Sequence, residues 1–252
     1  MMPAGVTKGA ASGIPFTLAP RPNFFFFGDS ITQAGSKVEP LGWVLLLADA
    51  YLAVNRCAEV SNRGFAGYNT RWGLVVLPQL IKEHGPIAPC LATIFFGAND
   101  ACREGARQHV PLAEYRKNLG EIIALMTKAW PQVTIILITP PPIDKEAWDA
   151  FKGQDGERCM ESVGEYAGVC KGVAAETGCQ CLDLFEEMGK LSDWKAMMMD
   201  GLHFNGRGNA VVHDLLKKLI DTKLPHLSSS KLPIHLPHHT DIDGESYMSV
   251  LQ

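Results

Sequence analysis

Short apolar runs alternate along the chain with longer segments in which apolar residues recur at helical spacing. The runs that predict buried strands are Phe24–Phe27, Ala58–Ser61, Leu91–Phe96, Val133–Thr139 and Cys181–Leu184. The segments with a helical period are Gly42–Asn55, Thr70–His84, Leu112–Trp130, Glu157–Thr177 and Asn205–Leu219. Because helices separate the strands and hairpin signals are almost absent, the pattern predicts a five-stranded parallel sheet with helices on both faces.

Polar turns follow three of the predicted strands, at the point where each strand ends. These turns are Gly28-Asp29-Ser30, Asn62-Arg63-Gly64 and Gly97-Ala98-Asn99-Asp100. Open parallel sheets bind ligands outside the carboxyl ends of their strands. The three turns therefore predict a functional site at one edge of the sheet.

Composition narrows the class of protein and its partners. The chain has 252 residues, and 46% of them are hydrophobic, which suits one globular domain. A net charge of −4 indicates no basic patch for nucleic acid. No apolar run reaches the roughly 20 residues that a membrane-spanning helix needs. We therefore expect neither a nucleic-acid partner nor a membrane span.

The cysteines indicate a reducing environment. The chain has seven of them, an odd number, with no Cys-x-x-Cys pair and no ligand cluster for a metal. We therefore expect free thiols, no metal and no cofactor. Residues 1–22 lack the continuous apolar core of a secretory signal, so a cytoplasmic location is expected, with organelle targeting left open. We expect a flexible tail over 1–22, the α/β domain over 23–222 and a C-terminal tail over 223–252.

Ser30 is the first candidate for chemistry, because it stands on a strand-to-helix turn after Gly28. A serine at a helix start can simply cap the helix. It becomes a nucleophile only if a base removes its proton and donors stabilise the anionic intermediate. Ser30 alone favours the cap, so the choice depends on partners elsewhere in the chain.

Asp200 and His203 offer the base and its orienting acid. A spacing of three residues on a loop or helical turn brings a carboxylate and an imidazole onto one side. The carboxylate could then hold one ring nitrogen while the other faces Ser30. The alternative is a helix start with Asp200 or Asn205 as cap and His203 on the surface.

The oxyanion donors would come from the three turns. The candidates are the backbone N–H groups of Ser30 and Gly64 and the side-chain amide of Asn99. Asn99-Asp100 could instead form an ordinary turn, since both residue types favour turns.

Taken in order, these segments resemble the SGNH subgroup of the GDSL hydrolases, and more closely the isoamyl acetate-hydrolysing esterase family. The likeness extends from about Phe24 to Leu219. The motifs that carry it are Gly28–Gln33, Asn62–Trp72, Thr93–Asp100, Gln108–Leu112, Ile138–Pro142, Val163–Ala167 and Asp200–His203.

The resemblance implies a three-layer α/β/α fold with flavodoxin-like strand order. It implies hydrolysis of carboxylic esters, acetates above all, through an acyl-enzyme on Ser30 with His203 as base and Asp200 as orienting acid. It implies an oxyanion hole made by Ser30, Gly64 and Asn99. The expected partner is a small-molecule ester.

Several alternatives stay open. The same machinery could deacetylate a sugar or another metabolite, and the fold could also be a non-catalytic binding module. A homodimer is one alternative for the oligomeric state. The polar stretch Lys145–Gly156 shows no residue that would fix a substrate, so the substrate-binding residues are unknown. Met197–Met199 could line a pocket or fill the core.

Overall fold

A five-stranded parallel sheet forms the centre of the computed structural model, which describes residues 5–54 and 56–242. Its strands are β3 (Asn23–Gly28), β4 (Glu59–Gly64), β5 (Pro89–Phe95), β6 (Thr134–Ile138) and β7 (Gln180–Leu182). They lie in the order β4-β3-β5-β6-β7, so the chain reverses direction across the sheet after the second strand. This is the flavodoxin-like order, and the predicted fold class is confirmed.

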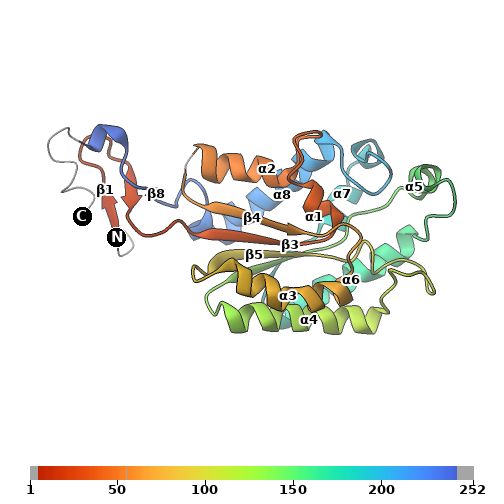
Figure 1. Cartoon of the computed structure of the whole chain (residues 1–252). Helices are drawn as coiled ribbons and strands as arrows, with labels where there is room; N and C mark the ends of the chain where they lie inside the picture. The colour runs from red at the N-terminus through yellow and green to blue at the C-terminus, as the bar shows by residue number, and fades with distance from the viewer. Residues whose placement is uncertain (1–4, 55, 243–252) are drawn as a thin grey trace.

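Helices cover both faces of the sheet (Figure 1). One face carries α1 (Ser30–Ala34), α2 (Trp43–Ala48) with its π-helical continuation over Asp49–Val54, α7 (Leu184–Gly189) and α8 (Gly206–Lys223). The other face carries α3 (Thr70–His84), α4 (Leu112–Ala129) and α6 (Met160–Thr177). Among the described residues, no helix is both long and apolar enough to cross a membrane.

The four consecutive phenylalanines of β3 explain why this strand lies inside the sheet. Successive side chains of a strand point to opposite faces, and here both faces are buried. Phe24 packs on Tyr51 with ring centroids 4.7 Å apart, whereas Phe25 packs on Trp130 on the other face at 5.1 Å. A strand that is covered on both faces needs a continuous apolar run, and that run was the signal in the sequence.

The two ends of the described chain form a second, small sheet, which the sequence did not predict. It contains β1 (Val6–Lys8), β2 (Pro15–Thr17) and β8 (Ile234–His235). Asp241 strengthens the connection, because its carboxylate accepts from the Ser12 backbone N–H at 2.8 Å and from the Ser12 hydroxyl at 2.5 Å. Strands β1, β2 and β8 thus lie in the segments that we expected to be a flexible tail over 1–22 and a C-terminal tail over 223–252. Residues 1–4 and 243–252 of those tails lie outside the described part.

A short helix, α5 (Lys145–Lys152), occupies part of the polar stretch that had no predicted structure. It ends at Gly153, which adopts the left-handed conformation typical of a helix C-terminus. Trp148 is buried beneath the helix and its ring N–H donates to the Gly156 carbonyl at 3.0 Å. This single large side chain anchors α5 at the carboxyl edge of the sheet.

Candidate active site

Ser30 is the first residue of α1, two residues after the end of β3. The N-cap is Asp29, whose carboxylate accepts from the Ile31 backbone N–H at 2.9 Å. Gly28 is required at the end of the strand, because a Cβ there would lie 2.5 Å from the Phe95 carbonyl oxygen. Asp29 therefore performs the capping role considered for Ser30, and the Ser30 hydroxyl is free to face His203.

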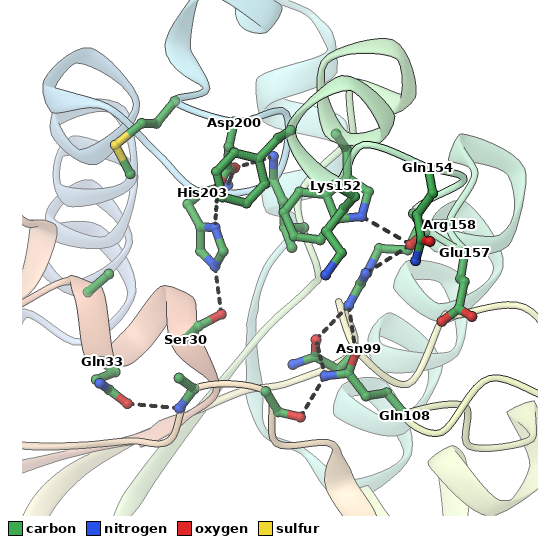
Figure 2. Close-up of a pocket in the computed structure, with 18 of the residues that line it drawn as sticks. Ser30, Gln33, Asn99, Gln108, Lys152, Gln154, Glu157, Arg158, Asp200 and His203 are labelled. Carbon is green, nitrogen blue, oxygen red and sulfur yellow. Dashed lines mark hydrogen bonds and ion pairs between the residues drawn. The ribbon is translucent and has the colours of Figure 1, made fainter.

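His203 and Asp200 lie in line with the Ser30 hydroxyl (Figure 2). The Ser30 Oγ is 2.8 Å from His203 Nε2, and His203 Nδ1 is 2.7 Å from Asp200 Oδ2. The other carboxylate oxygen of Asp200 accepts from the backbone N–H groups of Leu202 at 2.9 Å and His203 at 2.8 Å. Asn205, rather than Asp200, caps the following helix α8.

The charge of Asp200 determines how the histidine can act. Burial alone would raise the pKa of Asp200, but hydrogen bonds from the His203 ring and from two backbone N–H groups outweigh it and hold the pKa below 3.8. An ionised carboxylate can only accept, so His203 Nδ1 carries a proton. Nε2 is then the acceptor that faces the Ser30 hydroxyl, which is the arrangement of a general base.

Asn99 follows β5 on a buried loop and points its amide toward the same cavity (Figure 2). Its Oδ1 accepts from Arg158 Nη2 at 2.8 Å and from Gln108 Nε2 at 3.0 Å. Its Nδ2 donates one N–H to the Tyr68 carbonyl at 2.7 Å. An amide nitrogen has two N–H groups, so a second one remains for a ligand.

Gly64 does not lie where the sequence analysis expected it. Its backbone N–H donates to Asn62 Oδ1 at 2.9 Å, and Gly64 does not line the cavity that contains Ser30 and His203. The reason is local, since an asparagine side chain readily accepts from the backbone two residues on. Gly67 lines that cavity instead, and its N–H has no acceptor among the described residues. Gly67 therefore replaces Gly64 as the candidate donor from this turn.

The cavity has a volume of about 620 Å³ and opens beside α5. The polar residues that line it include Ser30, Asn99, Gln108, Asp200 and His203. Trp148, Phe151 and Lys152 of α5 contribute to its wall, although the sequence analysis found nothing in this stretch to contact a substrate. Of the three methionines, Met197 and Met198 are buried in the core, whereas Met199 is exposed and lines the cavity.

Two site residues, Gln108 and Arg158, were not assigned a role from the sequence. Gln108 begins one of the family motifs, so its position was marked but its contact with Asn99 was not. Arg158 had no sequence signal, because its partners Ala98 and Asn99 are 60 and 59 residues away in the chain. Within the described ranges, no three His, Cys, Asp or Glu side chains gather to hold a metal ion.

Residues 26–211 match the sequence profile of the GDSL-like lipase/acylhydrolase family. The chain belongs to this family. It is a carboxylic ester hydrolase, and the resemblance stated from the motifs is confirmed.

Relatives of this esterase are similar over nearly their whole length. A GDSL esterase/lipase of Arabidopsis thaliana is 39% identical, covering 90% of this chain and 96% of the relative. The isoamyl acetate-hydrolyzing esterase 1 homolog of Mus musculus is 42% identical, covering 88% of each chain. The isoamyl acetate-hydrolyzing esterase of Saccharomyces cerevisiae is 33% identical, covering 90% of this chain and 98% of that one.

Solved structures agree with the fold of the esterase. A lipase/acylhydrolase from Enterococcus faecalis superposes with a TM-score of 0.64 and 29% identity, covering 80% of this chain and 96% of that one. The acetylxylan esterase Axe2 from Geobacillus stearothermophilus superposes with a TM-score of 0.61 and 25% identity, covering 81% of this chain and 95% of that one.

Proposed function

We propose that this esterase hydrolyses small acetate-type esters through an acyl-enzyme on Ser30. The observation that carries the proposal is the continuous line from Ser30 Oγ to His203 Nε2, at 2.8 Å, and from His203 Nδ1 to Asp200 Oδ2, at 2.7 Å. A serine hydroxyl is a weak nucleophile until a base in this position removes its proton. Asp200 keeps the imidazole in the tautomer that can do so.

In the first half of the reaction, Ser30 Oγ bonds to the ester carbonyl carbon while its proton moves to His203 Nε2. The carbonyl oxygen becomes an oxyanion. Its donors are the Ser30 N–H, which has no intrahelical partner at the start of α1, the Gly67 N–H and the second Asn99 N–H. The C–O bond to the alcohol then breaks, and His203 gives its proton to the leaving alkoxide.

In the second half, water replaces the alcohol. His203 removes a proton from the water, whose oxygen bonds to the acyl carbon. The bond to Ser30 Oγ breaks, Ser30 regains its proton from His203, and the carboxylic acid is released. The same donors stabilise both tetrahedral intermediates, so one preorganised hole serves both steps.

The choice of acetates is supported first by relatives. The yeast and mouse relatives are named for isoamyl acetate hydrolysis. Phe151, which is 65% exposed, and Met199 give the cavity apolar walls that suit the alcohol part of such an ester.

Deacetylation of a sugar is the second candidate function. Phe151 stacks on Trp148 with ring centroids 5.6 Å apart at the cavity wall, and a structural neighbour is an acetylxylan esterase. A panel of acetate, butyrate and octanoate esters and an acetylated xylo-oligosaccharide, compared by kcat/KM, separates the two candidates. A preference for the sugar over isoamyl acetate would overturn our first choice.

The nucleophile is tested separately with Ser30→Ala. The wild-type protein should hydrolyse p-nitrophenyl acetate and be labelled by a fluorophosphonate, whereas Ser30→Ala should do neither. Ser230→Ala is the matched control, because Ser230 is exposed and does not line the cavity. Undiminished labelling of a folded Ser30→Ala variant would exclude Ser30 as the nucleophile.

We also propose that the protein works in a reducing compartment, with the cytoplasm as the first candidate. All seven cysteines are free, and three of them are buried. Fluorescence microscopy of the tagged full-length chain in its own cells tests this, and a secreted product would contradict it.

A further inference from the structure

A buried cation lies directly behind Asn99. Arg158 is only 6% exposed, although arginine is rarely buried without a carboxylate partner. No Asp or Glu of the described residues lies within 4.0 Å of its guanidinium. The guanidinium carbon Cζ of Arg158 lies over the Trp148 ring, 5.0 Å from the ring centroid. Burying an unpaired charge costs folding free energy, so its location calls for an explanation.

Every acceptor of the guanidinium is a carbonyl oxygen, and three of the four residues that supply them, Gly156, Asn99 and Gln108, line the cavity. Nε donates to the Ala98 carbonyl at 3.0 Å and Nη1 donates to the Gly156 carbonyl at 3.1 Å. Nη2 donates to Asn99 Oδ1 at 2.8 Å and to Gln108 Oε1 at 3.2 Å. The planar fork of arginine therefore connects the loop after β5 with the segment after α5.

The first effect of these contacts is on the direction of the Asn99 amide. Arg158 Nη2 and Gln108 Nε2 both donate to Asn99 Oδ1 (Figure 2). A flipped amide would place its own N–H groups against these two donors, so only one orientation is satisfied. That orientation leaves Nδ2 facing the Tyr68 carbonyl and the cavity.

The second effect reaches the other donor loop through Gln108. Gln108 Oε1 accepts from Arg158, while its Nε2 donates both to Asn99 Oδ1 and to the Gly67 carbonyl at 2.8 Å. Gly67 adopts a φ of +79°, a conformation that glycine, without a Cβ, adopts readily. One guanidinium thus holds Asn99 directly and Gly67 through one intermediate side chain.

The third effect is electronic. A hydrogen bond from a cation is stronger than one between neutral groups, and bonds in a chain polarise one another. Drawing electron density toward Asn99 Oδ1 makes the Nδ2–H group a better donor. The positive charge behind the amide is also fixed before the reaction, so no group has to reorganise when negative charge develops in front of it.

We propose that Arg158 is the positioning residue of the oxyanion hole: it orients and polarises the Asn99 amide and, through Gln108, anchors Gly67. The proposal rests on the proposed function, since it needs Asn99 and Gly67 to bind the oxyanion. Because an oxyanion exists only along the reaction path, Arg158 should support kcat far more than substrate binding.

The test is a double-mutant cycle between Arg158 and Asn99, with kcat and KM measured separately on p-nitrophenyl acetate. Asn99→Ala should lower kcat about a hundredfold or more. Arg158→Met should lower kcat by a factor of about ten to a hundred with KM changed less than about threefold. In the Asn99→Ala background, Arg158→Met should lower kcat by less than about a third of the factor that it has in the wild type, because the amide that Arg158 orients is gone.

Two further variants keep the test decisive. Arg158→Lys retains the charge with a single donor group, so its kcat should lie between those of the wild type and Arg158→Met. If Arg158→Met does not fold, Arg158→Lys takes its place in the cycle. Arg116→Met is the matched control, because Arg116 pairs on the surface with Glu176 and should keep wild-type kcat. Thermal unfolding of each variant identifies loss of folded protein.

Each outcome separates the proposal from the proposed function. If the Arg158 and Asn99 effects on kcat multiply fully, or if Arg158→Met raises KM alone, Arg158 has a structural role and the inference is overturned. If Asn99→Ala retains wild-type kcat, the oxyanion hole itself is misassigned, and the proposed function fails at that point. A cycle with strong non-additivity and an unchanged KM supports Arg158 as the positioning residue.

Discussion

Replacing Asp200 with asparagine tests the assignment of the orienting acid with the smallest change in shape. Asparagine keeps Oδ1, which accepts from the backbone N–H groups of Leu202 and His203. It places an amide N–H group where Oδ2 now accepts from His203 Nδ1 at 2.7 Å. Two donors cannot face each other, so His203 should adopt the other tautomer, with the proton on Nε2 and no acceptor toward Ser30.

The expected loss is large for so small a change. The corresponding substitution in a Ser-His-Asp protease lowers kcat about 10⁴-fold by this tautomer effect, which is about 5.4 kcal/mol of transition-state stabilisation at 1.36 kcal/mol per decade. Losing one hydrogen bond to a charged group costs only about 1.5–3 kcal/mol of stability, so a folded variant is expected. Steady-state hydrolysis of p-nitrophenyl acetate and a urea denaturation curve measure the two effects separately.

Asp193→Asn is the control for removal of a negative charge close by in the chain. Asp193 is exposed and pairs with Arg207 on the surface, so its variant should keep wild-type kcat. A folded Asp200→Asn variant with kcat within about tenfold of wild type would show that Asp200 does not determine the histidine tautomer.

Two further predictions concern the neighbouring turns. In Gly64→Ala the new Cβ would lie 2.0 Å from the Gln33 backbone nitrogen, so α1 must shift. The free energy of unfolding measured in urea should fall by about 1–3 kcal/mol or more, and activity should fall as well. Gly120→Ala is the control, because a Cβ at Gly120 meets no atom within 4 Å and should cost no stability; equal stability of both variants would refute the packing argument. Burial raises the pKa of Asp29 to about 7, although the Ile31 N–H lowers it in part, so the folded state holds a proton that the unfolded chain releases near pH 3.8. Relative to Asp29→Asn, the free energy of unfolding of the wild type should therefore fall as the pH rises from about 4 to about 7. If the difference in free energy of unfolding between the two proteins is the same at about pH 5 and about pH 8, the prediction is wrong.

Most of the central fold could be predicted from the sequence because the sheet is buried on both faces. Such strands appear as continuous apolar runs, and the helices between them keep a clear period. The strands β1, β2 and β8 could not be found this way. Each has only two or three residues, too few to show an alternation, and β2 pairs with β8 across more than 200 positions of sequence.

Within the site, contacts between residues close in the sequence could be predicted, whereas contacts between residues far apart in the sequence could not. The spacing of Asp200 and His203 is three residues, so their contact follows from the chain itself. Gly64 ends β4 and Gly67 lies three residues later, in the loop that follows, and only the structure shows that Asn62 accepts from the Gly64 N–H. The Arg158 contacts depend on the packing of α5 and the loop after β5, which no local pattern encodes.

The small sheet of β1, β2 and β8 determines how the enzyme can be attached to a solid support. It lies at the end of the molecule opposite α5, which forms part of the cavity wall (Figure 1). A linker joined beside either β1 or β8 would thus hold the protein by its far end, with the mouth of the cavity turned toward the solution. The two attachment sites should give the same orientation, since their strands belong to one sheet.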